Sequence, residues 1–205
     1  MSGEDRPHLE VVQGGAHQTR FEREVSAGQL GLWILLASLG MLFAATVVGF
    51  LIIRYRTDGW AQGLPGLPVG LLWSTGIILG ASVTLFLAVR AARRGEASRL
   101  VQMLWASLAL AIAFMVAQAI NWLDMVQADM PPNTANLYAF TFYLLTGTHA
   151  AHVLGGLIPL SITLRNAIRG RYSATQFEGV SLTAQYWHFL DIVWLILLGV
   201  MWGTT

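Results

Sequence analysis

The chain has 205 residues, of which 55% are hydrophobic and 11% are charged, whereas soluble domains carry about 25% charged residues, so a water-soluble globular protein is excluded. The net charge is +1 and the twelve basic residues, all Arg, are scattered between apolar blocks, which excludes a nucleic-acid partner. The absence of Cys excludes disulfides, Cys-ligated zinc, iron–sulfur clusters and covalent c-type haem attachment.

Residues 1–29 form a polar N-terminal arm with acidic side chains at Glu4, Asp5 and Glu10. The arm lacks the short apolar core of a cleaved signal peptide, and its acidic residues argue against a mitochondrial presequence. We therefore expect a flexible or surface-lying arm on the cytoplasmic side, with the first apolar span acting as its own insertion signal.

Residues 30–205 form the membrane domain. A helix needs about 20 mostly apolar residues to cross a bilayer, and five segments reach that length. Their long continuous runs favour helices over a β-barrel, whose strands would show alternating segments. The sequence predicts an all-α, polytopic membrane protein with a bundle of five transmembrane helices. The predicted spans are 30–53, 67–89, 100–123, 137–164 and 183–203.

Arginines are unevenly distributed along the chain. Ten lie in the arm and in the second and fourth joints between spans, against two in the first joint and none in the third. Because basic flanks resist translocation across the bilayer, we expect a cytoplasmic (or matrix) N-terminus and a C-terminus on the outside.

Small residues recur every four positions in two of the spans. Gly76 and Gly80 form a GxxxG pair, and Gly147, Ala151 and Gly155 share one stripe. This spacing favours close helix packing, although Gly and Ala are also simply common in membrane helices. We expect a tight bundle and a specific packing role for the Gly147 stripe.

Polar side chains inside the spans are the candidate functional residues, because they are costly to place in lipid. They are Gln118 and Asn121 in the third span, His149 and His152 in the fourth, and His188 and Asp191 in the fifth. His149 and Asp191 both lie roughly 12 Å from the cytoplasmic boundary of their antiparallel spans. We therefore expect these two side chains to share a hydrogen bond.

A structural network that fixes the bundle is the favoured role for these residues. A proton relay through His149, His152, His188 and Asp191 and the ligation of a haem are the alternatives. His149 and His152 lie on one turn and cannot bind opposite faces of one haem, which weakens the haem alternative. A haem-copper centre needs more His than the three inside the spans. We therefore expect no catalytic residue, bound cofactor or metal site in this chain.

Two stretches of the sequence indicate a protein family more specifically than the composition does. The segment FYLLTGTHAAHVLGG, Phe142 to Gly156, resembles the FYxLTGxHxxHVxxG segment of subunit III of haem-copper terminal oxidases. The segment YWHFLDIVW, Tyr186 to Trp194, is similar to the YWHFxDxVW signature of the same family. Weaker similarities are Gln118-x-x-Asn121-Trp122 to the family's QxxEW, and Leu32-Trp33 with Ala37-Ser38 to the opening of its first shared helix. The resemblance covers residues 28–205.

The resemblance implies a non-catalytic subunit III of a respiratory cytochrome c oxidase in a bacterial plasma membrane or mitochondrial inner membrane. Such a subunit binds catalytic subunit I, holds phospholipid in a cleft between helices and carries no haem or copper, which reside in the partner subunits. The complex oxidises ferrocytochrome c or quinol, reduces oxygen to water and pumps protons. Within it, subunit III supports stability, lipid organisation and proton uptake.

Three positions depart from the family pattern: Leu39, Asn121 and Ser181 stand where the family usually has carboxylates. These departures put a proton-antenna role through those positions in doubt and suggest a divergent branch. Alternatives are an accessory protein of nitric oxide reductase, a quinol oxidase subunit III, or an oxidase built into an unusual supercomplex. A free-standing membrane cytochrome and a small transporter are the alternatives from other classes.

Overall fold

The computed structural model describes residues 26–60, 66–132 and 136–204. Within these ranges all regular secondary structure is helical, and the predicted all-α fold with five helices is confirmed. The helices are α1 Ala27–Arg56, α2 Gly70–Arg93, α3 Ala97–Gln127, α4 Leu137–Ile168 and α5 Glu178–Gly203. At about 1.5 Å per residue, even the 24-residue α2 is about 36 Å long and exceeds the ~30 Å hydrocarbon layer.

The helices end at different residues from the predicted spans. α1 begins at Ala27, inside the segment expected to be a polar arm, because Ser26 caps it by accepting a hydrogen bond from the Gln29 N–H at 3.1 Å. The rest of that arm, residues 1–25, lies outside the described residues, so its separate character stays a prediction. α2 begins only at Gly70, after Pro68, and leaves 67–69 outside the helix.

Four of the helices, α1, α2, α3 and α5, are long and apolar enough to cross a membrane by length and composition. α4, with 32 residues, is the longest of the described helices, but it carries Thr, Gly and His residues through its middle. It contacts α1, α3 and α5, so much of its surface faces protein rather than lipid. This burial allows a helix with polar side chains in its middle to lie in the membrane with its neighbours.

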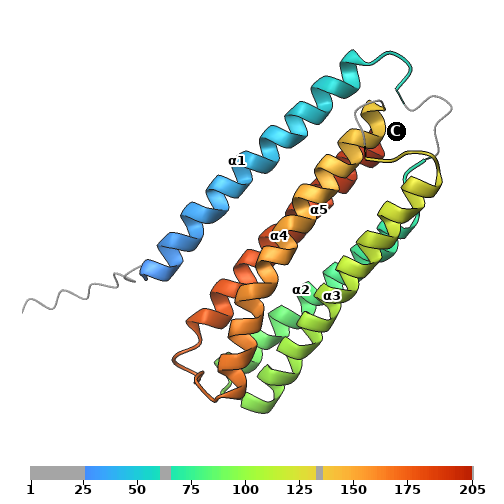
Figure 1. Ribbon diagram of the computed structural model, residues 1–205. Coiled ribbons are helices and arrows are strands. Elements are labelled where there is room, and N and C mark those ends of the chain that lie inside the picture. The colour runs from blue at the N-terminus through green and yellow to red at the C-terminus, as the bar shows by residue number, and fades with distance from the viewer. Residues whose placement is uncertain (1–25, 61–65, 133–135, 205) are drawn as a thin grey trace, which may run out of the picture.

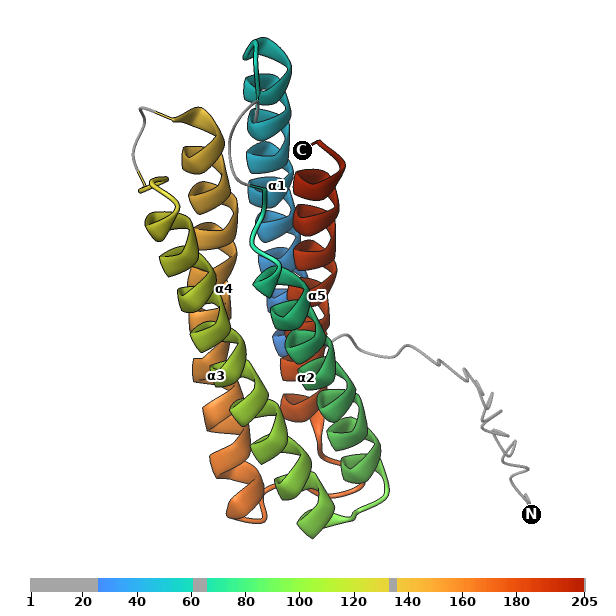
Figure 2. The ribbon, with the colours of Figure 1, turned by 90° about the vertical axis from the view of Figure 1, so that its right-hand side faces the viewer.

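Four helices form a ring, in which α2 contacts α3, α3 contacts α4, α4 contacts α5, and α5 contacts α2. Helix α1 lies outside the ring against α4 and α5, as the two views show (Figures 1 and 2). Consecutive helices alternate in direction, so the α2–α3 and α4–α5 connections lie at one end of the bundle. We call this the arginine-rich end; it contains Arg90, Arg93, Arg94, Arg99, Arg165, Arg169 and Arg171.

Two glycines end helices at the arginine-rich end. Gly95 follows α2 with φ +70° and Gly170 follows α4 with φ +66°, a left-handed conformation that favours Gly. The N–H groups of the next residues, Glu96 and Arg171, donate back to carbonyl oxygens five residues earlier, at 3.0 and 3.1 Å. These Schellman-type ends stop α2 and α4, and the connection from α2 to α3 is only three residues long.

Helix α1 is tied to α5 at both of its ends, although it lies outside the ring. At its start, the Ser26 hydroxyl bonds to the carboxylate of Glu178, the first residue of α5. At its other end, Arg54 Nε donates to the Thr204 carbonyl oxygen at 2.8 Å. These two contacts fix the position of α1 along the bundle.

Candidate functional site

Side-chain hydrogen bonds bridge every contact in the four-helix ring. The pairs are Thr84–Ser107 at 2.7 Å (α2–α3), Trp122–Thr146 at 3.0 Å (α3–α4), Thr163–Thr183 at 2.8 Å (α4–α5) and Trp194–Thr75 at 2.9 Å (α5–α2). Interhelical hydrogen bonds in membranes average about 0.6 kcal/mol each. They therefore fix the register of the helices more than they supply stability.

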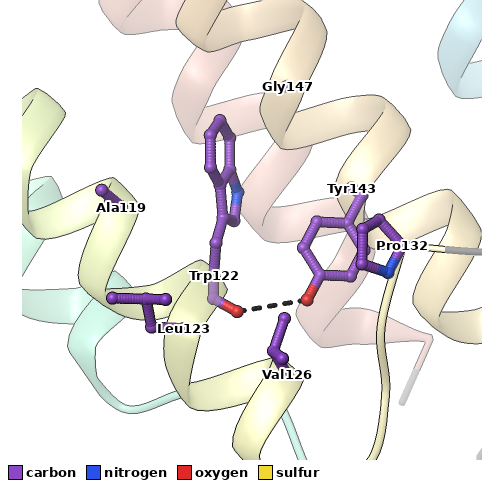
Figure 3. Close-up of a pocket in the computed structure, with 7 residues that line it drawn as sticks. All are labelled: Ala119, Trp122, Leu123, Val126, Pro132, Tyr143 and Gly147. Carbon is purple, nitrogen blue, oxygen red and sulfur yellow. Dashed lines mark hydrogen bonds between the residues drawn. The ribbon is translucent and has the colours of Figure 1, made fainter.

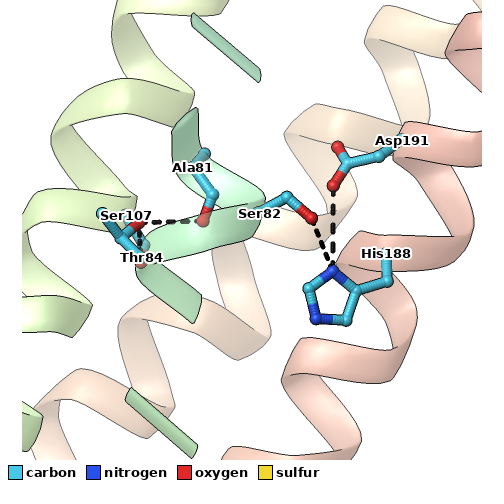
Figure 4. A network of polar contacts seen from close by, with 6 residues as sticks. All are labelled: Ala81, Ser82, Thr84, Ser107, His188 and Asp191. Carbon is cyan, nitrogen blue, oxygen red and sulfur yellow. Dashed lines mark hydrogen bonds and ion pairs between the residues drawn. The ribbon is translucent and has the colours of Figure 1, made fainter. Parts of the chain in front are cut away.

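Three polar side chains meet between α2 and α5 (Figure 4). The Ser82 hydroxyl lies 2.6 Å from His188 Nδ1, and Asp191 Oδ2 lies 4.0 Å from the same nitrogen. The Asp191 side chain is 6% exposed, whereas that of His188 is 38% exposed. His188 thus connects the edge of the bundle with a carboxylate in its interior.

His149 is fully enclosed by aromatic rings. Its ring centroid lies 4.9 Å from that of Trp194, 5.8 Å from Phe114 and 6.4 Å from Phe43. Among the described residues, neither of its ring nitrogens has a hydrogen-bond partner. The side chain is held by packing alone.

The predicted hydrogen bond between His149 and Asp191 is wrong. Neither side chain has a hydrogen-bond partner in the described part of the chain, and the ion-pair contact of Asp191 is to His188 on its own helix. Equal depth in the membrane does not fix the rotation of a helix about its axis. His149 faces rings of α1, α3 and α5, whereas Asp191 lies close to the side chains between α5 and α2.

His152 lies one turn from His149 but makes different contacts. Its Nδ1 lies 2.7 Å from the Thr148 carbonyl oxygen, and its ring lies 5.1 Å from that of Phe43. The backbone carbonyl of His152 accepts a hydrogen bond from the Tyr186 hydroxyl at 2.9 Å. The four ionisable residues of the fourth and fifth spans are thus divided between two faces of the bundle and do not form one chain of hydrogen bonds.

Gln118 and Asn121 are buried on α3 at 0% and 1% exposure. Both amide atoms of Gln118 and Nδ2 of Asn121 are without a hydrogen-bond partner within the described ranges. A Cβ on Gly70, the first residue of α2, would overlap Asn121 Oδ1. Sequence reasoning missed Gly70, for which the only available signal was a Gly shortly after Pro68 at the start of a span.

The small-residue stripe faces out of the bundle. A Cβ on Gly147 or Gly76 would meet nothing within 4 Å, one on Gly155 would only touch Tyr186 at 4.0 Å, and Ala151 is exposed. Gly80 has ordinary van der Waals room, 3.6 Å from Leu110. Among the described residues, no neighbouring helix therefore packs closely against the stripe, and a specific packing role for it stays a prediction.

Gly147 instead borders a groove between α3 and α4 (Figure 3). The groove has a cavity volume of about 500 Å³ and an almost wholly apolar lining that includes Trp122, Tyr143 and Pro132. The Tyr143 hydroxyl donates to the Trp122 and Met130 carbonyl oxygens, both at 3.1 Å. These bonds hold the Tyr143 ring at the wall of the groove, against the end of α3.

Hydroxyl groups are the site residues that sequence reasoning missed. Thr75 and Thr146 each bond a Trp of a neighbouring helix and also a carbonyl oxygen of their own helix, at 2.7 Å. The own-helix bond is available to Ser or Thr in almost any helix, so the residue type alone does not predict which hydroxyl faces a neighbour. Only the helix arrangement identifies these bridges.

The described residues offer no group of three or more His, Cys, Asp or Glu that could hold a metal ion. The polar side chains form separate pairs that cross-link neighbouring helices, and they do not converge on a common point. Chemically, this arrangement can fix the register of the bundle, and it places the half-buried His188 beside the buried carboxyl group of Asp191.

Comparison with known proteins gives consistent matches over nearly the whole chain. The family model described as cytochrome c oxidase subunit III matches residues 10–204. Cytochrome c oxidase subunit 3 of Corynebacterium diphtheriae is 29% identical over 81% of this chain and 82% of that protein. The proteins of the same name from Synechocystis sp. and Bacillus sp. (strain PS3) are 31% and 30% identical, over 82% and 84% of this chain and 71% and 84% of their own lengths.

Proposed function

This chain belongs to the cytochrome c oxidase subunit III family, and from that premise we propose that it is the non-catalytic subunit III of a respiratory terminal oxidase. In this proposal it binds catalytic subunit I, and haem and copper reside in the partner subunits. The observation that carries the proposal is the family match over residues 10–204. The electron donor is cytochrome c, as the names of the relatives indicate for those proteins.

The buried polar residues would then serve to brace the subunit. His149 packs among rings from three other helices, and Thr75, Thr146, Thr163 and Thr183 bridge neighbouring helices. A bundle fixed in this way presents a rigid apolar surface to subunit I and to surrounding phospholipid. The Gly147 stripe, of which Ala151 and Gly155 are exposed, is a candidate for contact with another subunit, because small side chains allow close helix approach.

The arginine-rich end is placed in the cytoplasm, because basic residues resist translocation. On this placement the N-terminus is cytoplasmic and the C-terminus is outside, in a bacterial plasma membrane or mitochondrial inner membrane. Arg54 and Arg56 are the exceptions at the other end, and Arg54 is held there by the Thr204 carbonyl oxygen and the Trp60 ring.

Support of proton uptake is the second candidate function, and one observation favours it. His188 borders a pocket at the arginine-rich end and contacts both Ser82 and the buried Asp191. In contrast, the three positions where the resemblance leads one to expect carboxylates hold Leu39, Asn121 and Ser181. If this chain supports proton uptake, His188 is therefore the residue we propose as its entry point.

Affinity purification of the tagged chain from gently solubilised membranes tests the main proposal. We expect mass spectrometry to identify an oxidase subunit I with the chain, and the preparation to consume oxygen with ferrocytochrome c. Membranes from a strain without the tag, taken through the same purification, are the control for proteins that bind the affinity resin non-specifically. Co-purification of a nitric oxide reductase instead would contradict the proposal, and so would a haem band in the reduced-minus-oxidised spectrum of the separated chain.

A further inference from the structure

A pocket with a cavity volume of about 470 Å³ lies between α2 and α5 at the arginine-rich end. Its α2 wall combines two cations with apolar side chains: Phe86, Val89, Arg90 and Arg93. Its α5 wall is mostly polar and consists of Ser181, Ala184, Gln185 and His188. The pocket therefore fits an occupant that is both acidic and partly apolar.

The two arginines of this pocket lack a counter-charge from the bundle. Within the described part of the chain, no carboxylate lies within ion-pair distance of Arg90 or Arg93, and none lines the pocket. At the same end of the bundle, by contrast, Arg94 and Arg99 share Glu96, at 3.8 and 3.5 Å. The pocket thus holds positive charge that a carboxylate from outside the helices can neutralise.

The chain enters α1 at the edge of this pocket. The Ser26 hydroxyl, just before α1, bonds to the carboxylate of Glu178 at the start of α5. The Arg93 guanidinium lies 5.8 Å from the centre of the ring of Phe177, the residue before Glu178. Ser181, the first pocket residue of α5, follows Glu178 by less than one helical turn. The residues directly before Ser26 therefore start beside Arg93.

The sequence directly before Ser26 has the two properties that the pocket requires. It reads Phe21-Glu22-Arg23-Glu24-Val25. Glu24 and Glu22 lie two and four residues before Ser26, so in an extended chain they reach up to about 7 and 14 Å from it. Alternate side chains of an extended segment point to opposite sides, so both carboxylates can face α2 while Arg23 faces α5.

We propose that residues 21–25 of this same chain bind in the pocket. Glu22 and Glu24 pair with the two arginines of α2, and Arg23 lies beside the side chain of Gln185 on α5. Exposed ion pairs are individually weak. A segment joined directly to α1, however, has an effective concentration on the order of millimolar at the pocket, which favours it over an acidic segment of another protein. The interaction lies within this chain, so it does not depend on the proposed function.

Disulfide trapping tests this contact, because the chain contains no Cys of its own. The tagged full-length chain carries Arg23→Cys with Gln185→Cys and is purified with whatever remains attached. Slow oxidation then forms the bridge, which peptide mass spectrometry quantifies over time. The control pair is Arg23→Cys with Ser173→Cys, because Ser173 is exposed and the neighbouring Tyr172 would touch a Cβ on Gly179 at the start of α5. We expect the bridge to residue 185 to form faster than the bridge to residue 173.

The reporter pair leaves the four charges of the proposed ion pairs in place, so these can be varied separately. An exposed ion pair contributes about twofold to a binding equilibrium, so E22Q with E24Q should slow formation of the bridge to residue 185 about fourfold. R90Q with R93Q should slow it by the same factor. Because Glu22 and Glu24 precede α1, the first variant tests the contact even if the second fails to fold.

The matched charge control is R94Q with R99Q, which removes two positive charges from the same end and should leave the rate unchanged. Three outcomes would overturn the proposal. They are equal rates for the bridges to residues 185 and 173, equal slowing in the control, and an unchanged rate in E22Q with E24Q. Loss of the bridge when phosphatidylglycerol is added to the detergent would also overturn it, because a lipid would then occupy the pocket in the membrane.

Discussion

Replacing Gly156 by Leu forces α4 away from α5 and lowers the free energy of unfolding by about 2–3 kcal/mol, the upper part of the range for overpacked cores. A Cβ at residue 156 would lie 2.7 Å from Tyr186 Cε1 and 3.3 Å from Trp187 Cζ2. Neither ring can move easily, because Trp187 is 1% exposed and the Tyr186 hydroxyl is bonded to the His152 carbonyl oxygen. The helices themselves must therefore separate.

Titration of the purified chain with sodium dodecyl sulfate, followed by circular dichroism, measures this loss. Gly147→Leu is the matched control on the same helix, because a Cβ there meets nothing within 4 Å. We expect the control to change the free energy of unfolding by less than about 0.5 kcal/mol. Equal losses in the two variants would contradict the helix contact at Gly156.

Replacing Trp194 by Ala is expected to lower the free energy of unfolding by about 3–5 kcal/mol, the range for removing a large aromatic side chain from a core. The ring is fully buried, its centroid lies 4.9 Å from that of His149 and 5.3 Å from that of Phe114, and its Nε1 bonds Thr75. The substitution opens a cavity beside the enclosed His149 and removes the α5–α2 bridge. The same titration measures the loss.

Trp73→Ala is the control for Trp194→Ala, because it makes the same chemical change on α2 at a residue that is 77% exposed. A change within about 0.5 kcal/mol is expected there. Trp194→Phe keeps most of the ring and loses only the hydrogen bond, so it should lose far less stability than Trp194→Ala. A loss below about 1 kcal/mol for Trp194→Ala would show that the ring is not a core residue.

The sequence predicted the helices well, because uninterrupted apolar length is a direct requirement of the bilayer. Their ends were less predictable. α5 begins at Glu178, five residues before the predicted span, since Glu178, Gly179 and Ser181 are helical but interrupt the apolar run. α1 begins at Ala27 because of the Ser26 cap, a local signal that an apolar window does not contain.

The identities of the buried polar residues were also predictable, because few polar side chains fall inside the spans. Gln118, Asn121, His149 and Asp191 are all buried. The side chains that surround them were not predictable. They depend on the rotation of each helix about its axis and on which helix lies beside it, and no local pattern encodes either. His149 consequently lies among Phe43, Phe114 and Trp194 instead of beside Asp191.

In the proposed function the polar residues of α5 brace the bundle, and Asp191→Asn tests this role most directly. This change keeps the size of the side chain but replaces the carboxyl group, whose Oδ2 lies 4.0 Å from His188 Nδ1, by an amide. Asp58→Asn, the same change at an exposed residue, is the control. The measurement is the proton-to-electron ratio of purified oxidase together with the content of this subunit. We predict reduced retention of the subunit and a normal ratio in the complexes that keep it, whereas full retention with loss of pumping would contradict the bracing role.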